Sequence, residues 1–352
     1  MNIFLINVLL TFIWGFVFLV IVGDKIGKKW FCFIASVQWV LISGLRGMTV
    51  AEDMYAYEKK FHEVLKTDWG DIFDNFYFVY VEGEGKDPGY DVFQKIVQLF
   101  TQNFQAFLFI VAIIFFFAMG VWIYKNSQMP MMSFIIFDSF LYSFFALTGT
   151  RQTLATVLIV FIGDKFIKEK KFWRFLIVSV IAYTIHKSAI CYFPFFLISM
   201  IPVKKRSIAG VIILSPLLFI FKEPFFEVLG KLVGYEYDEL ESTGAYLFTI
   251  MYLIIVVFAV ILLGHIKENC ENYNIYYNAL FMGLLLIPLI FVNPAAMRAV
   301  QYYSLYLMLL VPEIIRSFEK RISGPLYVIM MSALLIATNA FVRTDYSFFW
   351  QN

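Results

Sequence analysis

Long apolar runs alternate with short polar segments along most of the chain. A helix rises about 1.5 Å per residue, so roughly 20 apolar residues cross about 30 Å of hydrocarbon. Runs that meet or approach this length lie at 3–22, 30–45, 104–124, 208–221, 245–264, 275–292, 299–315 and 324–342. We interpret the first run as a membrane span rather than a cleaved signal peptide, because no basic region precedes it and no small-residue cleavage site follows it.

Two apolar stretches, 131–163 and 172–202, are too long for one span and short for two. Polar residues interrupt each near its middle, at Gly149-Thr150-Arg151-Gln152 and at His186-Lys187-Ser188. If each stretch forms two short spans, the loops rich in Lys and Arg all fall on one side of the membrane, which the positive-inside rule assigns to the cytoplasm. We therefore predict about twelve transmembrane helices with both termini outside.

The composition supports a membrane protein. Hydrophobic residues make up 61% of the 352 residues, aromatic residues 20% and charged residues 15%, with a mean hydropathy of +0.77. Soluble domains typically carry about 25% charged residues, so a water-soluble globular protein is excluded. The three cysteines fit neither a metal-binding spacing nor a disulfide framework. We predict one all-α, polytopic membrane domain over residues 1–352.

Two segments lie outside this pattern of spans, at 46–103 and 222–244, and we expect both to be external loops. The first is long, acidic and rich in Tyr and Phe. Within it, apolar residues recur at helical spacing over 91–100, which predicts an amphipathic helix lying on the membrane interface. Pro88-Gly89 is the expected turn before this helix.

Charged and polar side chains at the membrane are costly and mark functional sites more often than chance. Arg46, Arg151 with Gln152, His186 and Arg298 all fall at the outer ends of predicted spans. Each has a simpler interpretation: an arginine there can anchor in the headgroups, and a histidine can bond a backbone carbonyl. A further acid, Asp138, lies inside a predicted span, where it either pairs with a polar group of another span or lines a cavity.

These residue types suit chemistry on a lipid-linked phosphate. Arginine presents a permanently charged fork that matches phosphate oxygens, and several arginines at one face suit a diphosphate. His186 or Asp53 can accept a proton from an attacking hydroxyl, and Glu52 with Asp53 can bind sugar hydroxyls. The residues alone do not separate transfer of a lipid-linked sugar from its transport.

Five short motifs, in this order, resemble those of the EpsG family of Wzy-like polysaccharide polymerases. They are LRGMTVAEDMYAY at 45–57, DPGY at 87–90, RQTLA at 151–155, HKSAI at 186–190 and AMRAVQYY at 296–303. The chain departs from the family pattern at Ala51, Glu52 and Asp87, where Gly, Thr and Glu are usual.

The resemblance implies a GT-C-like glycosyltransferase in the bacterial cytoplasmic membrane, with its active site on the extracytoplasmic side. Donor and acceptor would both be undecaprenyl-diphosphate-linked oligosaccharides, joined into an exopolysaccharide, capsule or O-antigen without a cofactor or metal. The bilayer, a chain-length regulator and a flippase would be its partners, and nucleic acid would not.

On this hypothesis Arg151 and Arg298 hold the donor diphosphate in one outward-opening cradle, and Arg46 holds the acceptor carrier. His186 or Asp53 is the base, and His186 is the first choice because it lies closer to the diphosphate pocket in the predicted topology. Glu52, Tyr57, Gln152 and Tyr302 would position sugar or phosphate. The alternatives are a glycan ligase that uses the same donor, a flippase or transporter of the same lipid, and a membrane O-acyltransferase.

Overall fold

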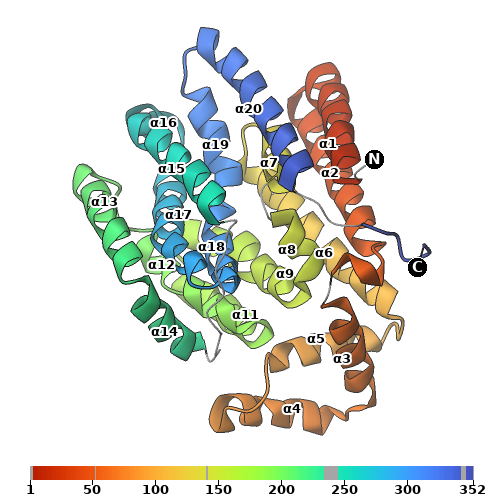
Figure 1. The fold of residues 1–352 in the computed structure, drawn as a ribbon. Coiled ribbons are helices and arrows are strands. Elements are labelled where there is room, and N and C mark those ends of the chain that lie inside the picture. The colour runs from red at the N-terminus through yellow and green to blue at the C-terminus, as the bar shows by residue number, and fades with distance from the viewer. Residues whose placement is uncertain (1–2, 52, 140–141, 234–244, 342–345, 352) are drawn as a thin grey trace. The chain divides into compact units, whose positions relative to one another are not determined.

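The computed structural model describes residues 3–51, 53–139, 142–233, 245–341 and 346–351. Apart from one isolated antiparallel bridge between Arg46 and Phe348, these residues form only helices and their connections, so the predicted all-α class is confirmed (Figure 1). They group into two compact units. Unit 1 comprises Met1–Lys165, Ile177–Lys187 and Val328–Asn352, and unit 2 comprises Phe166–Leu176 and Ser188–Tyr327.

The helices of unit 1 are α1 (Ile3–Trp14), η1 (Gly15–Val22), α2 (Asp24–Gly44), η2 (Met48–Val50), α3 (Met54–Lys66), α4 (Trp69–Tyr77), η3 (Phe78–Glu82), α5 (Pro88–Gln98), α6 (Phe104–Asn126), α7 (Pro130–Ser139), α8 (Tyr142–Thr148), α9 (Thr150–Thr156) and η4 (Val157–Ile162). Those of unit 2 are α12 (Phe195–Ile198), α13 (Lys205–Ile220), α14 (Lys222–Val233), α15 (Ala245–Ile261), α16 (Leu263–Asn269), α17 (Tyr273–Leu286), η6 (Ile287–Phe291), η7 (Pro294–Ala296), α18 (Met297–Ser304) and α19 (Leu307–Arg316). Four more helices contribute residues to both units: α10 (Gly163–Lys168), α11 (Phe172–Ile185), η5 (Lys187–Tyr192) and α20 (Lys320–Phe341).

Three helical segments are long and apolar enough to cross a membrane: Ile3–Val22, Phe104–Asn126 and Tyr273–Phe291. Two further pairs qualify only if each is one broken span, since α13 and α14 meet at 87° and α15 and α16 at 72°. The described residues thus hold three to five candidate spans, and the count of twelve stays a prediction. The segment 222–244 begins with helix α14 rather than with a loop, and its remaining residues lie outside the described ranges.

The two polar interruptions break helices where the sequence places them. Helix α8 ends at Thr148 and α9 begins at Thr150, because Gly149 leaves the helical conformation with φ −108° and ψ 72°. Helix α11 ends at Ile185, and a 3₁₀ turn starts at Lys187. Both breaks place a polar side chain at a helix end, where its backbone groups can find partners outside the helix.

The core of unit 1 forms where α2 packs along α6. Trp39 of α2 stacks on Phe116 of α6 with ring centroids 5.2 Å apart and planes at 11°. A Cβ on Gly120 would lie 2.0 Å from Oγ of Ser36, so α2 and α6 approach closely at this glycine. Small residues at a crossing let two apolar helices approach closely, as in membrane helix pairs.

The acid inside a predicted span is paired. Asp138 of α7 is fully buried and accepts two hydrogen bonds from Nδ2 of Asn7 on α1, at 3.1 and 3.2 Å. Gln38 of α2 donates to the Asn7 backbone carbonyl at 2.7 Å and accepts from Trp14 Nε1 at 2.9 Å. Of the two interpretations of Asp138, pairing with a polar group of another helix is therefore the one observed.

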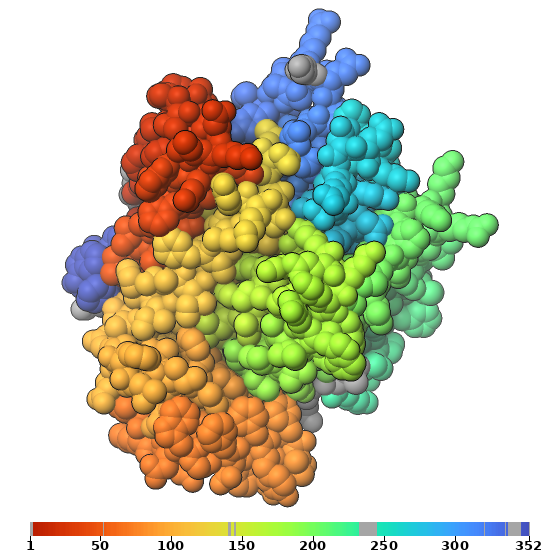
Figure 2. Space-filling model, turned by 180° about the vertical axis from the view of Figure 1, so that it is seen from behind, coloured from red at the N-terminus to blue at the C-terminus, as the bar shows by residue number. Residues whose placement is uncertain are grey.

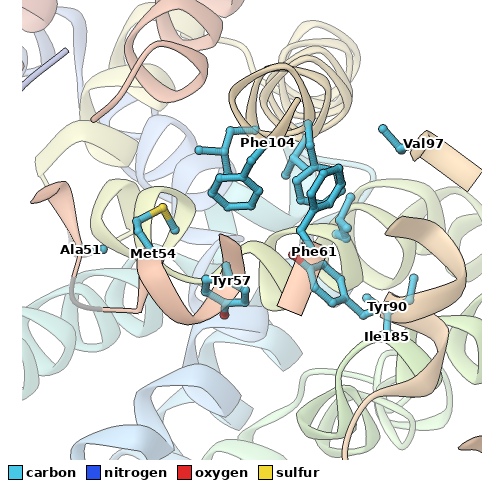
Figure 3. Close-up of a cluster of buried hydrophobic side chains, with 12 residues drawn as sticks. Ala51, Met54, Tyr57, Phe61, Tyr90, Val97, Phe104 and Ile185 are labelled. Carbon is cyan, nitrogen blue, oxygen red and sulfur yellow. The ribbon is translucent and has the colours of Figure 1, made fainter. Parts of the chain in front are cut away.

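Residues 46–103 fold into α3, α4, η3 and α5, which connect the end of α2 to the start of α6 (Figures 1 and 2). Tyr57 and Phe61 of α3 and Tyr90 of α5 pack on the first turns of α6 in one buried cluster (Figure 3). Lys95 Nζ donates to the carbonyls of Val64, Leu65 and Thr67 at 3.1, 3.1 and 2.7 Å, which ties α5 to the end of α3.

Helix α5 confirms the helix predicted at 91–100, but the expected turn at Pro88-Gly89 is wrong. Pro88 is the first residue of the helix, a position that suits proline because its missing N–H would have no helical partner. The turn lies one residue earlier, at Asp87, whose φ is 51°. Aspartate is among the few non-glycine residues that tolerate this left-handed conformation.

The C-terminal segment 346–351 lies against the end of α2 in unit 1. Gly47 N–H donates to Ser347 O at 2.7 Å, and Phe349 N–H donates to Leu45 O at 3.0 Å. Tyr346 donates its hydroxyl to Ile42 O at 2.6 Å. These bonds flank Arg46 on both sides in sequence, and Arg46 is 1% exposed.

Unit 2 is organised around α17, which packs on α15, α18 and α19. Tyrosine hydroxyls join these helices through backbone carbonyls: Tyr252 donates to Leu280 O at 3.0 Å, and Tyr277 donates to Ala259 O at 2.5 Å. A Cβ on Gly283 would lie 2.0 Å from the Tyr252 hydroxyl, so α15 and α17 approach closely there.

Candidate functional site

A polar cavity of about 310 Å³ opens in unit 1 between α3, α5 and α9. Its walls carry cations, carboxylates and two tyrosines within a small space. The lining residues are Asp53, Ala56, Tyr57, Lys60, Lys86, Asp87, Tyr90, Asp91 and Arg151. Charged groups of both signs that converge in one cavity are typical of a binding or catalytic site.

Asp87 reaches this site because α5 begins in close contact with α11. A Cβ on Gly89 would lie 2.2 Å from Thr184 Oγ1 and 2.9 Å from its carbonyl carbon, so only glycine permits this approach. The contact brings the start of α5 to the end of α11, where His186 and Lys187 follow. The Pro-Gly pair after Asp87 thus sets where its carboxylate lies.

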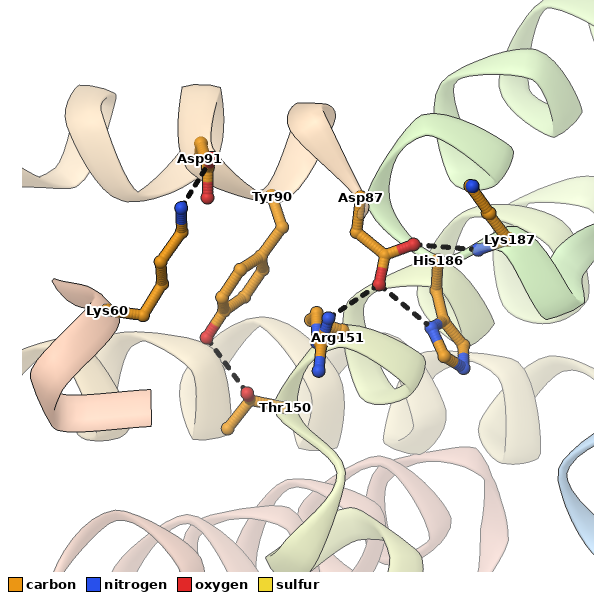
Figure 4. A network of polar contacts seen from close by, with 8 residues as sticks. All are labelled: Lys60, Asp87, Tyr90, Asp91, Thr150, Arg151, His186 and Lys187. Carbon is orange, nitrogen blue, oxygen red and sulfur yellow. Dashed lines mark hydrogen bonds and ion pairs between the residues drawn. The ribbon is translucent and has the colours of Figure 1, made fainter. Parts of the chain in front are cut away.

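The Asp87 carboxylate is the centre of a network of three contacts (Figure 4). Arg151 donates from Nη1 to Oδ2 at 2.7 Å, and Nδ1 of His186 lies 3.5 Å from the same oxygen. The backbone N–H of Lys187 donates to Oδ1 at 3.0 Å. Three segments far apart in sequence therefore meet on one carboxylate.

The network keeps Asp87 ionised although it is buried. Burial alone would raise the pKa of this carboxyl, but the neighbouring His186 ring, the charge of Arg151 and the Lys187 N–H together hold the pKa below its usual value. The Asp87 side chain is 1% exposed and that of Arg151 is 32% exposed. The carboxylate of this ion pair is thus buried, whereas the guanidinium is accessible from the cavity.

Two tyrosines complete the wall around Arg151. Its guanidinium carbon lies 5.4 Å from the ring centroid of Tyr57, within the range of a cation–π contact. The Tyr90 hydroxyl lies 2.9 Å from Oγ1 of Thr150, the residue before Arg151. Arg151 is therefore positioned by an ion pair and by a ring, with α9 fixed beside it.

A second ion pair lies farther along α5. Lys60 Nζ is 3.1 Å from Oδ2 of Asp91, and Asn75 of α4 approaches the same oxygen at 3.5 Å. Burial raises the pKa of Asp91, and the charge of Lys60 offsets only part of this effect. The Lys60 side chain is 44% exposed, so the cation stays accessible from the cavity.

The structure brings several predicted site residues together. Asp53, Tyr57 and Arg151 line the cavity, whereas His186 is 4% exposed and lies behind Asp87 rather than in the wall. Gln152 is buried in α9 next to Arg151. Glu52 lies outside the described residues.

Arg46 is also in unit 1 but does not line the cavity. It donates from Nη1 to the carbonyl of Ser43 and, at 3.0 Å, to the Ser43 hydroxyl. Within the described residues, its Nε and Nη2 have no hydrogen-bond partner. Burial lowers the pKa of Arg46 to about 10, which still leaves it protonated at neutral pH.

Arg298 and Tyr302 belong to unit 2. Arg298 lines a small, mostly apolar cavity of about 60 Å³ together with Ser188, Cys191, Phe226 and Leu289. Tyr302 is fully buried, and its hydroxyl lies 2.9 Å from Oγ of Ser188, so it joins α18 to η5. The shared cradle of Arg151 and Arg298 stays a prediction.

The residues that the sequence reasoning missed are Lys60, Lys86, Asp87, Tyr90 and Asp91. Asp87 and Tyr90 had a signal, because both stand in the DPGY motif that carries part of the family resemblance. Apart from their charge, nothing in the sequence marks Lys60 and Asp91 as site residues. In the part of the chain that the structure describes, no group of three or more His, Cys, Asp or Glu side chains is placed to hold a metal ion.

Comparison with known proteins agrees with the motifs. No curated protein and no solved structure matches the chain. The sequence profile of the EpsG family matches residues 29–351, which include the cavity of unit 1 and the helices of unit 2. The chain therefore belongs to the EpsG family.

Proposed function

We propose that this protein is a membrane glycosyltransferase that joins lipid-diphosphate-linked oligosaccharide repeat units into a polysaccharide. Membership of the EpsG family supports polysaccharide polymerisation. The observation that carries the proposal is the cavity of unit 1, where Arg151, Lys60 and Lys86 surround a space lined by carboxylates and tyrosines. Such a cavity can take a diphosphate and a sugar together.

In the proposed reaction a hydroxyl oxygen of the acceptor sugar forms a bond to the anomeric carbon of the donor. The bond from that carbon to the phosphate oxygen breaks, and the lipid diphosphate leaves with the electron pair. Arg151, Lys60 and Lys86 stabilise the negative charge that develops on the leaving oxygen. Tyr57 and Tyr90 form part of the cavity wall beside which the sugar would lie.

The proton of the attacking hydroxyl must go to a base. Of the two candidates, Asp53 lines the cavity and His186 does not. We assign Asp53 as the base. His186 acts through Asp87: it helps to keep that carboxylate ionised, and the carboxylate in turn holds the Arg151 guanidinium at the cavity wall.

The finer features of the proposal rest on the sequence. The donor is an undecaprenyl diphosphate glycan, and the reaction takes place at the outer face of the cytoplasmic membrane, because the basic loops assign the opposite face to the cytoplasm. That Arg298 adds a second guanidinium for the diphosphate stays a prediction from the sequence; within unit 2 it lines a small, mostly apolar cavity.

The test uses the purified full-length chain in lipid nanodiscs with a synthetic undecaprenyl-diphosphate repeat unit and EDTA. A ladder of longer lipid-linked glycans supports the proposal. Absence of a ladder in the wild type, with substrate binding demonstrated, contradicts it. Transport without elongation, measured in sealed vesicles, would instead indicate a flippase.

Two neighbouring lysines provide a matched pair of variants. Lys60 lines the cavity, whereas Lys59 is 80% exposed and pairs with Glu63 on the same helix. We expect Arg151→Ala to reduce elongation by ~10²–10³ and Lys60→Ala to reduce it by about tenfold. Lys59→Ala should elongate like the wild type. Equal activity in Lys60→Ala and Lys59→Ala would show that the cavity does not hold the substrate.

A further inference from the structure

Aromatic rings form a continuous row from α4 to the end of α11. Trp69 and Phe73 stack with centroids 6.0 Å apart, and Phe73 and Phe76 stack at 6.4 Å. Phe76 contacts Tyr80 of η3 at 6.3 Å, and Tyr80 contacts Tyr183 of α11 at 5.6 Å. We call Trp69, Phe73, Phe76, Tyr80 and Tyr183 the aromatic row.

The aromatic row is accessible along most of its length. Trp69 is 37% exposed, Phe73 57% and Tyr80 38%, and Tyr77, beside Phe76 on α4, is 56% exposed. Isolated exposed aromatics are common, but a contiguous exposed row marks a surface that binds something. The segment 69–82, which carries all members of the row except Tyr183, is orange in Figure 2.

The row ends at the site described above. Tyr183 directly precedes Thr184, which packs against Gly89 at the start of α5, and His186 follows three residues later. The segment that follows η3 also runs toward the site. It continues from Tyr80 through two glycines with positive φ to Lys86 and Asp87 of the cavity wall. The row therefore ends beside the start of α5, where Asp87 lines the cavity.

The charge around the row indicates whether it binds a membrane surface or a glycan. Residues 67–85 contain Asp68, Asp71, Asp74, Glu82 and Glu84 and no Lys or Arg. Helices that lie on a membrane surface usually carry Lys and Arg on their polar face, where they meet anionic lipids. An acidic, aromatic surface instead suits a neutral polyhydroxyl chain: ring faces pack on the C–H faces of sugars, and carboxylates accept hydrogen bonds from hydroxyls.

The scaffold beneath the row is fixed. Ile72 and Val79 are buried on the inner side of α4 and η3, and Asn75 approaches Asp91 of α5. The centroid steps of 5.6–6.4 Å are comparable with one sugar residue of an extended glycan. A row held in place in this way binds without a large ordering cost.

From this geometry we propose that the aromatic row is a binding track for the growing polysaccharide, over which several sugar residues lie while the chain end occupies the cavity. The inference rests on the proposed polymerase function and adds to it a second binding region outside the reacting centre. It predicts that long glycans gain affinity from the row and that a single repeat unit does not.

The experiment compares the full-length wild type with Trp69→Ala/Phe73→Ala in nanodiscs of neutral lipid. The probe is the polysaccharide of the cells that carry this gene, released from its lipid by mild acid. We expect the double variant to bind this probe about tenfold more weakly, the effect of losing one to two ring contacts. It should also make shorter polymers, while the rate of a single transfer between one-repeat substrates stays unchanged.

Phe100→Ala is the matched control, because Phe100 is an 84% exposed ring of the same region that is not part of the row. It should bind the polysaccharide like the wild type, and thermal unfolding should show all variants folded. Equal polysaccharide affinity in the wild type and the double variant overturns the track. So does quenching of Trp69 by brominated lipids, measured as the difference between the wild type and Trp69→Phe, because the row would then face acyl chains.

The outcomes separate the two proposals. If the wild type forms no ladder yet binds the polysaccharide more tightly than the double variant does, the polymerase function fails and the track stands. If the wild type forms ladders and the double variant binds and elongates equally well, the track fails alone.

Discussion

Arg151 donates from Nη1 to Oδ2 of Asp87 at 2.7 Å; the Arg151 side chain is 32% exposed and the Asp87 side chain 1%. The buried carboxylate accepts one N–H of the Arg151 guanidinium and so anchors this cation at the cavity wall. This arrangement makes Asp87 a positioning residue for Arg151, and it defines what each substitution should do.

Asp87→Asn should reduce elongation by about 10²-fold, because the amide keeps the shape but removes the charge that orients Arg151. Asparagine tolerates the left-handed backbone at this position, so the loss is not caused by strain. Single-turnover elongation measures the effect, and the change should lie in the rate of transfer rather than in polysaccharide affinity.

Asp87→Glu tests whether a carboxylate at this position is enough to orient Arg151. The carboxylate is retained, although Glu fits the left-handed backbone less well than Asp, so activity should recover to within about tenfold of the wild type. Asp74→Asn, at an exposed position of α4, is the control and should match the wild type in transfer rate. Equal loss in Asp87→Asn and Asp87→Glu would assign Asp87 a purely structural role.

Asp87, which precedes α5, and Asp91, within it, should respond to pH in opposite directions. The folded pKa of Asp87 is lowered, so its contribution to stability is present above the unfolded value of ~3.9 and is lost as pH falls through the folded value. The folded pKa of Asp91 is raised, so its contribution is present at low pH and is lost as pH rises through the folded value.

Thermal unfolding of the wild type, Asp87→Asn and Asp91→Asn between about pH 3 and 7 measures this difference. The wild type should be more stable than Asp87→Asn at neutral pH, with the difference shrinking in acid. Asp91→Asn should be as stable as the wild type or more stable at neutral pH. Parallel pH curves for the three proteins would contradict both directions.

Substitutions of Asp53 and of His186 should differ in their effects on transfer rate and melting temperature. Asp53 lies at the exposed cavity wall, so Asp53→Asn should lower the transfer rate by ~10²–10⁴, the usual size of general-base catalysis, with no change in melting temperature. His186 is buried against Asp87, so His186→Gln should lower both activity and melting temperature. If His186→Gln alone abolishes the pH dependence of transfer, His186 is the base instead.

The helix breaks at Gly149 and His186 could be predicted from the sequence, because polar residues inside apolar runs are a local signal. Sequence reasoning also identified Arg151, Asp53 and Tyr57, whose residue types indicate phosphate and sugar chemistry. It could not reach the role of Asp87, whose partners lie 64 and 100 residues away and carry no shared periodicity. The span count depends on how bent helices lie in a bilayer, which charge patterns constrain only indirectly.

The pair formed by Asn7 and Asp138 provides a test within the apolar core. Asn7 makes two hydrogen bonds to a fully buried carboxyl, 131 residues away. Intramembrane hydrogen bonds contribute ~0.6 kcal/mol on average and up to ~1.7, and an unpaired buried acid adds a desolvation cost, so Asn7→Leu should destabilise by about 1–2 kcal/mol. The double variant Asn7→Leu/Asp138→Leu removes both polar groups and should recover most of this loss. Thermal unfolding in one detergent gives the cycle, and additive effects of the two single substitutions would show that the pair does not couple α1 to α7.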